Sequence, residues 1–354
     1  MMKAAVWHGR EDVRIEQVSE PPVPPRGQVQ VQVAWCGICG TDLHEFVGGP
    51  VYIPVERPHP LTGIQAPVQV GHEMSGTVIG VGEGVEDFKV GDRIAACPIV
   101  GCMECRWCRS GSMAQCDKVA FLGTSWTGGA LAERLNLNAY QCYKLTDTIS
   151  DEIGALVEPF SSAVRAVAQS GAGPNDNVAI VGAGPIGLMA LMAARIRGAK
   201  RVVAVEVAER RIQAALQCGA DAVINPLQSD PEAQAREITG GDGFDVVLEC
   251  AGQPASVLMA GKITRTRGRL VIMGVFEKPA ALDLFDLVFR EKIVSGSMSG
   301  YGLYNETIQI MSDPRFRGDL LISDRIGIDD LVAKGYHGLL HEKDQHVKIL
   351  VRPV

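Results

Sequence analysis

The sequence lacks three features that would each assign it to a large class of proteins. It has no basic excess, since 34 Lys and Arg stand against 41 Asp and Glu for a formal net charge of −7, which argues against a nucleic-acid-binding face. No apolar run approaches the roughly 18 residues that a membrane-spanning helix needs. The first residues, MMKAAVWHGREDVRIE, contain no apolar stretch typical of a secretory leader. These absences predict a cytoplasmic protein that binds neither nucleic acid nor membrane.

Internal repeats are also missing, so a solenoid is not indicated. The 354 residues are too many for one ordinary hydrophobic core and indicate two domains. Residues 1 to about 150 are rich in glycine, proline and alternating β-branched residues, and strands broken by turns are expected there at 29–35, 66–82 and 91–98. The segment PPVPPRG at 21–27 is expected to be a connector.

From Asn177 the pattern changes to short apolar strands that alternate with helices. Such an alternation predicts a parallel sheet with both faces covered, and therefore an α/β fold. The expected strands are 177–182, 201–207, 244–252 and 268–275, and the expected helices begin near Pro185 and Ala208. After about Ser297 the alternation fades, and 348–353 is expected to be a strand.

Four cysteines lie within residues 101–116, GCMECRWCRSGSMAQC. Thiols stay reduced in the cytoplasm, and four crowded thiolates require a cation among them. A structural zinc ion takes a closed tetrahedron of four sulfurs. The alternatives are cysteines that bind no metal and an iron–sulfur cluster, but in the bacterial ferredoxin motif the fourth cysteine follows after three residues and precedes proline. Here it follows after seven and precedes Asp117. We predict a structural zinc site formed by Cys102, Cys105, Cys108 and Cys116.

A second constellation is spread over CGICGTDLH (36–44), VGHEMSG (70–76) and LVEPF (156–160). These segments offer sulfur, nitrogen and oxygen donors that suit a zinc ion with an open coordination position. The donors are Cys39, His72, Glu73 and Glu158. Spacing alone leaves open an ordinary histidine–glutamate pair with no metal.

The segment VAIVGAGPIGLMA (178–190) places Gly182, Gly184 and Gly187 in a G-x-G-x-x-G pattern between a strand and a helix. Glycines allow the tight turn there and the close approach of pyrophosphate to the helix N-terminus. Glu206 follows at the end of the next strand, where a carboxylate can bind the ribose hydroxyls. This context predicts NAD, in preference to NADP. The other expected cofactor-binding residues are Pro185, Ile186, Arg211, Cys250, Gly274 and Val275.

The order of these motifs over the whole chain resembles the zinc-dependent medium-chain dehydrogenases. Within them it is similar to the polyol branch of sorbitol, threonine and 2,3-butanediol dehydrogenases, and the loop HEFVGGPVYIP (44–54) is similar to the butanediol-oxidising members. The resemblance implies a GroES-like, mostly-β catalytic domain with a zinc lobe at 1–155 and 297–354. It implies a Rossmann domain with a doubly wound parallel sheet at 156–296, and a homodimer or homotetramer.

The resemblance also implies roles for the site residues. Cys39 and His72 become ligands of the catalytic zinc, and Glu158 ligates it directly or through water. Glu73 becomes an alternating ligand or a carboxylate behind the ligands. Thr41 and His44 match the positions that pass the substrate proton to solvent.

The implied activity is zinc-dependent, NAD-linked oxidation of a small secondary alcohol or vicinal diol of the 2,3-butanediol/acetoin type. An alcohol releases hydride only after its hydroxyl proton is largely lost, and zinc lowers the pKa of a bound water to about 7. Sorbitol-, glucose- and L-threonine-type substrates stay open, as does a non-catalytic redox sensor that binds zinc and nucleotide. The complete set of catalytic residues favours the enzyme.

The remaining cysteines are expected to be small buried apolar residues, and Trp126 is expected to be either a pocket wall or a core aromatic. These cysteines are Cys36, Cys97, Cys142, Cys218 and Cys250.

Overall fold

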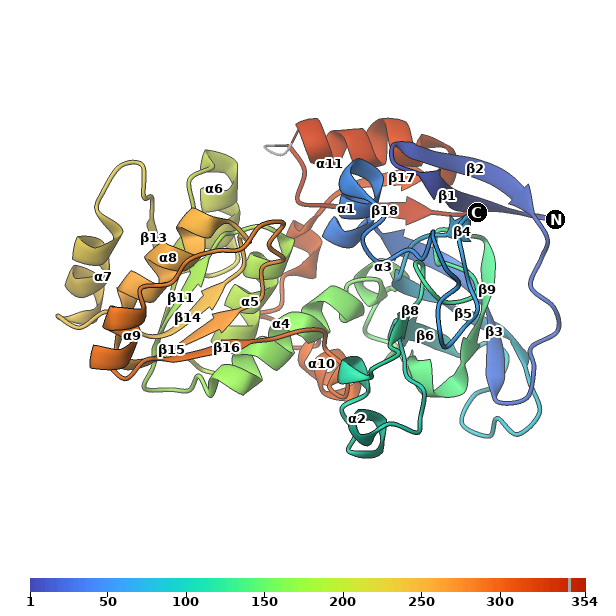
Figure 1. The fold of residues 1–354 in the computed structure, drawn as a ribbon, viewed down its shortest axis with the longest axis horizontal. Helices are drawn as coiled ribbons and strands as arrows, with labels where there is room; N and C mark the ends of the chain where they lie inside the picture. Colours follow the sequence, from blue (N-terminus) through green and yellow to red (C-terminus); the bar gives the residue numbers. More distant parts are fainter. Residues whose placement is uncertain (343–344) are drawn as a thin grey trace. The chain divides into compact units, whose positions relative to one another are not determined.

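The computed structural model describes residues 1–342 and 345–354 and divides into two compact units (Figure 1). Unit 1 comprises Met1–Glu158, Tyr304–Ile308 and Ile322–Val354, and unit 2 comprises Pro159–Leu303 and Gln309–Leu321. The last residues of the chain therefore belong to unit 1 again, although most of unit 2 precedes them in the sequence. Within the described residues, no helix combines the length and the apolar character that crossing a bilayer requires.

Unit 1 is built mainly of antiparallel strands. Its largest sheet has the order β10-β6-β5-β3-β18-β17, with β9 also paired to β3. These strands are β3 (Gln28–Gly37), β5 (Glu73–Val81), β6 (Arg93–Ala96), β9 (Arg134–Asn138), β10 (Cys142–Lys144), β17 (Ile322–Gly327) and β18 (Lys348–Arg352). Alternate residues of β3, such as Val29, Val31 and Val33, enter the apolar core of the unit, as the period of a strand requires.

Two smaller sheets complete the strands of unit 1. One has the order β2-β1-β4, and the other pairs β7 with β8. Their bounds are β1 (Met2–Gly9), β2 (Asp12–Val18), β4 (Val68–Gln69), β7 (Ile99–Val100) and β8 (Ala120–Phe121). The connector at 21–27 lies outside all strands, as predicted.

The strand expected at 66–82 is broken into β4 and β5. Gly71 separates them with a φ of +95°, and a Cβ at this position would lie 2.6 Å from the backbone nitrogen of Leu131. A residue with a side chain cannot occupy such a turn without displacing its neighbour. The break leaves His72 on the short link between the two strands, directly before Glu73 opens β5.

Short helices connect the strands of unit 1. They are α1 (Gly40–Gly48), α2 (Arg106–Arg109), α3 (Asp151–Gly154), α11 (His337–His341) and a π-helical turn at Leu331–Tyr336. Helices α4 (Val157–Ser170) and α10 (Tyr304–Ile310) each include residues of both units.

Unit 2 contains a parallel sheet of six strands in the order β13-β12-β11-β14-β15-β16. The strands are β11 (Asn177–Val181), β12 (Arg201–Val205), β13 (Ala222–Ile224), β14 (Phe244–Glu249), β15 (Thr264–Ile272) and β16 (Ile293–Gly296). In order of appearance this is 3-2-1-4-5-6, the Rossmann arrangement of a doubly wound sheet. The predicted α/β fold is confirmed.

Helices cover both faces of this sheet. They are α5 (Pro185–Ile196), α6 (Glu209–Gln217), α7 (Pro231–Thr239), α8 (Pro254–Ile263) and α9 (Leu284–Phe289). Helix α5 contacts α6, and α7 contacts α8. Because β–α–β crossovers are right-handed and the chain reverses direction across the sheet between β13 and β14, the two pairs lie on opposite faces.

Candidate metal and cofactor sites

The four cysteines of residues 101–116 converge in unit 1. Their four Sγ atoms all lie within 4.8 Å of one another. Backbone N–H groups also point at the sulfurs, since Cys102 donates to Cys116 Sγ at 3.3 Å and Cys105 donates to Cys102 Sγ at 3.3 Å. Amide donors of this kind stabilise thiolates, so the lobe is preorganised for a cation with four sulfur ligands.

Without a cation, the thiols of this lobe cannot all ionise. The backbone N–H of Cys108 lowers the pKa of Cys105 to about 6, whereas burial raises the pKa of Cys108 to about 12. A divalent cation removes this conflict because it favours the thiolate form of every ligand. The donor set therefore fits the predicted zinc ion.

A second cluster brings together three of the four residues predicted to bind the catalytic metal. Ligand atoms of Cys39, His72 and Glu73 all lie within 4.8 Å of one another. Cys39 is the N-cap of α1, His72 lies on the link between β4 and β5, and Glu73 is the first residue of β5. Sulfur, imidazole and carboxylate donors in a buried setting fit a zinc ion with an open position.

Asp42 supports this cluster, and sequence reasoning missed it. Its Oδ2 accepts a hydrogen bond from the backbone N–H of Cys39 at 2.9 Å, and its Oδ1 lies 3.9 Å from His72 Nδ1. Burial opposes the charged form of His72, but the Cys39, Asp42 and Glu158 charges raise its pKa well above the ordinary value. The sequence did contain a signal for this contact. Asp42 follows Cys39 by three residues, which is the spacing of a capping box at the start of a helix.

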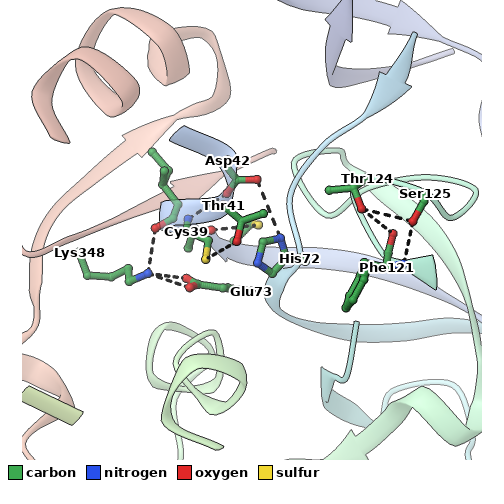
Figure 2. A network of polar contacts seen from close by, with 12 residues as sticks. Cys39, Thr41, Asp42, His72, Glu73, Phe121, Thr124, Ser125 and Lys348 are labelled. Carbon is green, nitrogen blue, oxygen red and sulfur yellow. Dashed lines mark hydrogen bonds and ion pairs between the residues drawn. The ribbon is translucent and has the colours of Figure 1, made fainter. Parts of the chain in front are cut away.

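Lys348, the first residue of β18, also reaches this cluster (Figure 2). Its Nζ donates to Glu73 Oε2 at 2.6 Å, to Glu73 Oε1 at 2.9 Å and to the carbonyl of Ile38 at 2.8 Å. Burial lowers the pKa of Lys348, but Glu73 and Cys39 outweigh this effect and raise it. Sequence reasoning missed this residue because a lysine that opens an apolar strand gives no sign of its partner.

Glu158 lies near this cluster but, in the described part of the chain, is not one of the three residues whose ligand atoms lie within 4.8 Å of one another. Burial raises the pKa of Glu158 to about 7, against the opposing charges of His72 and Lys348. A carboxylate with such a pKa can hold a proton or bind a cation near neutral pH.

Two further predicted residues lie on α1. Thr41 Oγ1 is 3.6 Å from Cys39 Sγ, so its hydroxyl adjoins the metal cluster. His44 follows Thr41 by three residues on the same helix and is partly exposed. Residues with this spacing share one face of a helix.

The glycine-rich turn of unit 2 leads from β11 into α5. A Cβ on Gly187 would lie 1.8 Å from the carbonyl oxygen of Gly182, so that position requires glycine. A Cβ on Gly184 would meet no atom within 4 Å, which leaves open space at the N-terminus of α5. Pro185 and Ile186 form the first turn of that helix, whose free N–H groups attract a diphosphate.

Glu206 directly follows β12 and is only 7% exposed. Its Oε2 accepts a hydrogen bond from Ala183 N–H at 2.8 Å, and its Oε1 accepts from Val207 N–H at 2.7 Å and Ala208 N–H at 3.0 Å. The carboxylate therefore lies against the glycine-rich turn, where an adenosine ribose would be expected.

The other predicted cofactor residues lie on the carboxyl side of neighbouring strands of unit 2. Cys250 follows β14 and donates its backbone N–H to Val181 at 2.8 Å, and Gly274 and Val275 follow β15. A Cβ on Gly274 would lie 2.4 Å from the backbone nitrogen of Gly252. Arg211 lies on α6 and is partly exposed. The turns after β11 and β14 meet where the strand order reverses, the usual ligand position in this fold.

The residues expected to be structural are mostly buried. Cys36, Cys97, Cys142 and Cys218 are buried, and Cys250 is partly buried. Trp126 packs against the apolar core of unit 1 and lines an open cavity of about 410 Å³, together with Pro21 and Arg134. The cysteine, histidine and glutamate of the metal cluster do not line this cavity.

Two family models match the chain. The alcohol dehydrogenase GroES-like domain matches residues 25–147, and the zinc-binding dehydrogenase model matches residues 185–313. The chain is 42% identical to (R,R)-butanediol dehydrogenase of Bacillus subtilis, over 99% of this chain and 100% of that protein. It is 35% identical to (R,R)-butanediol dehydrogenase of Neisseria gonorrhoeae, over 99% of each.

Solved structures of dehydrogenases also match the chain over nearly its full length. The crystal structure of 2R,3R-butanediol dehydrogenase from Bacillus subtilis matches with a TM-score of 0.94 at 40% identity, over 100% of both chains. An Escherichia coli alcohol dehydrogenase complexed with NADH matches with a TM-score of 0.88 at 26% identity, over 99% of both chains. A zinc-binding dehydrogenase from Sinorhizobium meliloti bound to NADP matches with a TM-score of 0.89 at 30% identity, over 100% of this chain and 99% of that one.

The predicted family and activity class are therefore confirmed. The two family models lie on the two predicted kinds of fold, GroES-like and Rossmann. By its motifs, its fold and its full-length relatives, the chain belongs to the zinc-dependent medium-chain alcohol dehydrogenases, oxidoreductases that use a nicotinamide cofactor.

Proposed function

We propose that this dehydrogenase oxidises small vicinal diols of the 2,3-butanediol type with NAD, and reduces the corresponding hydroxyketones, of the acetoin type, in the reverse direction. The observation that carries the proposal is the buried cluster of Cys39, His72 and Glu73 in a chain that matches butanediol dehydrogenases from end to end. A redox sensor without catalysis would not need to retain this donor set.

The residues of the cluster have distinct tasks in this proposal. Cys39 and His72 hold the catalytic zinc, and Glu73 or Glu158 provides the carboxylate. When bound, the zinc supplies the Lewis acidity that lets the substrate hydroxyl lose its proton near neutral pH. Thr41, beside Cys39, takes up that proton as it gives its own hydroxyl proton to His44, and His44, on the same face of α1, releases a proton to solvent.

The four-cysteine lobe takes a second, structural zinc ion in this proposal. Four sulfur ligands leave no coordination position for substrate, so this ion holds the lobe and takes no part in the reaction. All ten cysteines lie in the part of the chain that the structure describes, and none of them forms a disulfide there. Both zinc sites need reduced thiols, which supports a cytoplasmic location.

NAD in preference to NADP follows from the position of Glu206. The carboxylate lies at the end of the second strand of the Rossmann sheet, where it can accept hydrogen bonds from ribose hydroxyls. A 2′-phosphate would bring like charges together at this buried position. Arg211 can stack on the adenine from α6 without binding a phosphate.

We also propose that the protein is a homodimer or homotetramer in which unit 2 pairs with a second copy. Apolar side chains on α9 and β16 are strongly exposed: Leu284, Phe285, Val288, Phe289 and Ile293 are between 59% and 71% exposed. Strand β16 is an edge strand, whose open backbone groups can pair with the same strand of another copy.

A substrate panel tests the proposed function. NADH formation should be measured with (R,R)-butane-2,3-diol, sorbitol, glucose and L-threonine, and NADH consumption with acetoin. We expect kcat/KM to be highest for the diol. A tenfold advantage of sorbitol, glucose or L-threonine would show that the substrate assignment is wrong.

A further inference from the structure

Glu249, the last residue of β14, is a fully buried carboxylate with only one oxygen hydrogen-bonded. Its Oε1 accepts from the N–H groups of Ala251 and Gly252, both at 2.9 Å, and from the hydroxyl of Ser256 at 2.6 Å. Among the buried carboxylate oxygens of the residues that the structure describes, Oε2 of Glu249 alone has no hydrogen-bond partner. All three donors are neutral groups, so none of them cancels the charge.

A buried carboxylate normally has partners for both oxygens, because burial of an unpaired charge is costly. Glu206 shows that the end of a strand in unit 2 can provide them, since its Oε2 accepts from Ala183 N–H and its Oε1 accepts from Val207 N–H and Ala208 N–H. The free oxygen of Glu249 is therefore not a general property of this edge of the sheet. It points to a positive partner that a ligand supplies.

The free oxygen lies among the turns that are expected to hold the cofactor. A Cβ on Gly274 would lie 2.5 Å from Oε2 of Glu249, so the backbone of the turn after β15 comes directly against this oxygen. The turn that Glu249 holds also meets the glycine-rich turn, because a Cβ on Gly182 would lie 2.9 Å from the Cβ of Ala251. The carboxylate thus adjoins the loops after β14 and β15, and its own turn contacts the loop after β11.

The order of the strands gives the direction in which a dinucleotide crosses this edge. Glu206 follows β12, where the adenosine ribose is expected, and the helix N-terminus after β11 attracts the diphosphate. The sheet continues from β11 to β14 and β15, so the nicotinamide half is expected on that side. Glu249 therefore lies on the side of the ring that takes up hydride.

We propose that Glu249 makes the cofactor site selective for the oxidation state of the nicotinamide, so that the oxidised form, NAD⁺, is favoured over NADH. The ring is positively charged in NAD⁺ and loses this charge when it takes up hydride, whereas the diphosphate keeps the same charge in both forms. A fixed negative charge shielded from water therefore stabilises the oxidised form. Such a site loads the cofactor that alcohol oxidation consumes and holds its product, NADH, less tightly.

Equilibrium binding tests this inference without catalysis. Dissociation constants are measured in the absence of alcohol, for NADH from its fluorescence and for NAD⁺ from its displacement of NADH. Glu249→Gln removes the charge and keeps an acceptor oxygen for the turn, and Glu249→Asp keeps the charge. Glu206→Gln is the matched control, because it makes the same change on the adenosine side, where the charge of the cofactor is the same in both oxidation states.

We expect the ratio of Kd for NADH to Kd for NAD⁺ to fall about threefold to tenfold in Glu249→Gln, as for one charge in a medium of effective dielectric constant near 20. Glu249→Asp should keep the ratio of the parent. Glu206→Gln should weaken both forms in the same proportion. If Glu249 only holds its turn, Glu249→Gln will change both dissociation constants by one factor, and the unchanged ratio overturns the inference. An equal fall in Glu206→Gln also overturns it.

Ser256→Ala gives an answer without replacement of the carboxylate, should Glu249→Gln fail to fold. It removes one donor from Oε1 and leaves the charge less compensated, so the ratio should rise. A ratio that stays constant or falls contradicts the proposal. The inference needs only the nicotinamide cofactor of the family. A parent that prefers NADP would refute the role proposed for Glu206, and the same ratios measured with NADP⁺ and NADPH would still decide the role of Glu249.

Discussion

Glu206 and Ala183 are joined by a hydrogen bond of 2.8 Å between the backbone N–H of Ala183 and Oε2 of the glutamate. The carboxylate at the end of β12 therefore has a structural task at the glycine-rich turn as well as the proposed contact with ribose. Its other oxygen accepts the N–H groups of Val207 and Ala208 at the entrance to α6. Substitutions at this position will change the turn and the cofactor together, so the two effects have to be separated.

Glu206→Ser should lower kcat/KM with NAD, because it removes the acceptor for the ribose hydroxyls. It should raise kcat/KM with NADP, because it removes the charge that opposes a 2′-phosphate. It should also lower Tm, since Ala183, Val207 and Ala208 lose their acceptor, at about 1 kcal/mol for each hydrogen bond. Glu206→Gln keeps an acceptor and should change the cofactor ratio with less effect on Tm. The measurement is kcat/KM for both cofactors. A parent that prefers NADP, or a ratio that neither variant changes, would contradict the role of Glu206.

The two metal sites should respond differently to loss of one ligand. Cys39→Ser or His72→Ala should abolish activity while circular dichroism and Tm stay close to those of the parent, because an open site does not hold the fold. Cys105→Ser should lower Tm or solubility, because three thiolates lose their cation. Metal analysis should show one zinc fewer per chain in each case. A stable but inactive Cys105→Ser protein would reverse the roles of the two sites.

Asp245 should make the stability of unit 2 depend on acid pH. It accepts hydrogen bonds from Asn177 N–H at 2.7 Å and Arg265 Nε at 2.6 Å. Burial opposes its charge, but these donors outweigh burial and lower its pKa. A lowered pKa stabilises the fold above the ordinary value for aspartate, about 4, and this contribution is lost as pH falls through the lowered value.

Asp245→Asn should therefore lower the free energy of unfolding by about 1–2 kcal/mol at pH 7. The difference from the parent should shrink as pH falls below about 4, because the parent carboxylate is then protonated as well. Urea denaturation at pH 7, 4, 3 and 2.5 measures the difference between the free energies of unfolding of the parent and the variant. Asp242→Asn, at an exposed aspartate of the same unit, is the control and should show little change. A constant difference at all pH values would show that the charge of Asp245 is not the cause.

Phe285→Glu should shift the proposed oligomer toward monomers. Phe285 stacks on Phe289 with 4.1 Å between ring centroids, and both are about 70% exposed in the isolated chain. A charge placed in an apolar interface has to be desolvated without a partner. Light scattering coupled to gel filtration measures the mass. Leu227→Glu, at another exposed apolar residue of unit 2, is the control, and an equal effect of both variants would place the interface elsewhere.

The Rossmann sheet could be predicted because its signals are local. The glycines at 182, 184 and 187 lie on one turn, and the runs 177–182 and 244–252 contain β11 and β14. The strand expected at 66–82 was only partly right, because its alternation does not reveal the left-handed turn at Gly71 that places His72 at the site. Without the resemblance to a family, the spacing of Cys39 and His72 would have left open whether they bind a metal ion.

Contacts between distant segments could not be predicted in this way. Lys348 is 275 positions from Glu73 along the chain, and the two meet only because β18 pairs with β3, which also pairs with β5. The sequence predicted the strand at 348–353, and β18 confirms it, but it gave no information about which strands would be its neighbours.

The return of the chain to unit 1 has a consequence for how the enzyme is made. Cys39, His72 and Glu73 leave the ribosome before unit 2 is synthesised, whereas Lys348 follows it. Since N-terminal segments generally fold first during synthesis, β3 and β5 can pair before Lys348 has been made, when Glu73 has no ammonium beside it. Insertion of β18 beside β3 later brings the Lys348 ammonium to Glu73. The buried ion pair of Lys348 and Glu73 therefore forms only when the last strand of unit 1 joins its sheet.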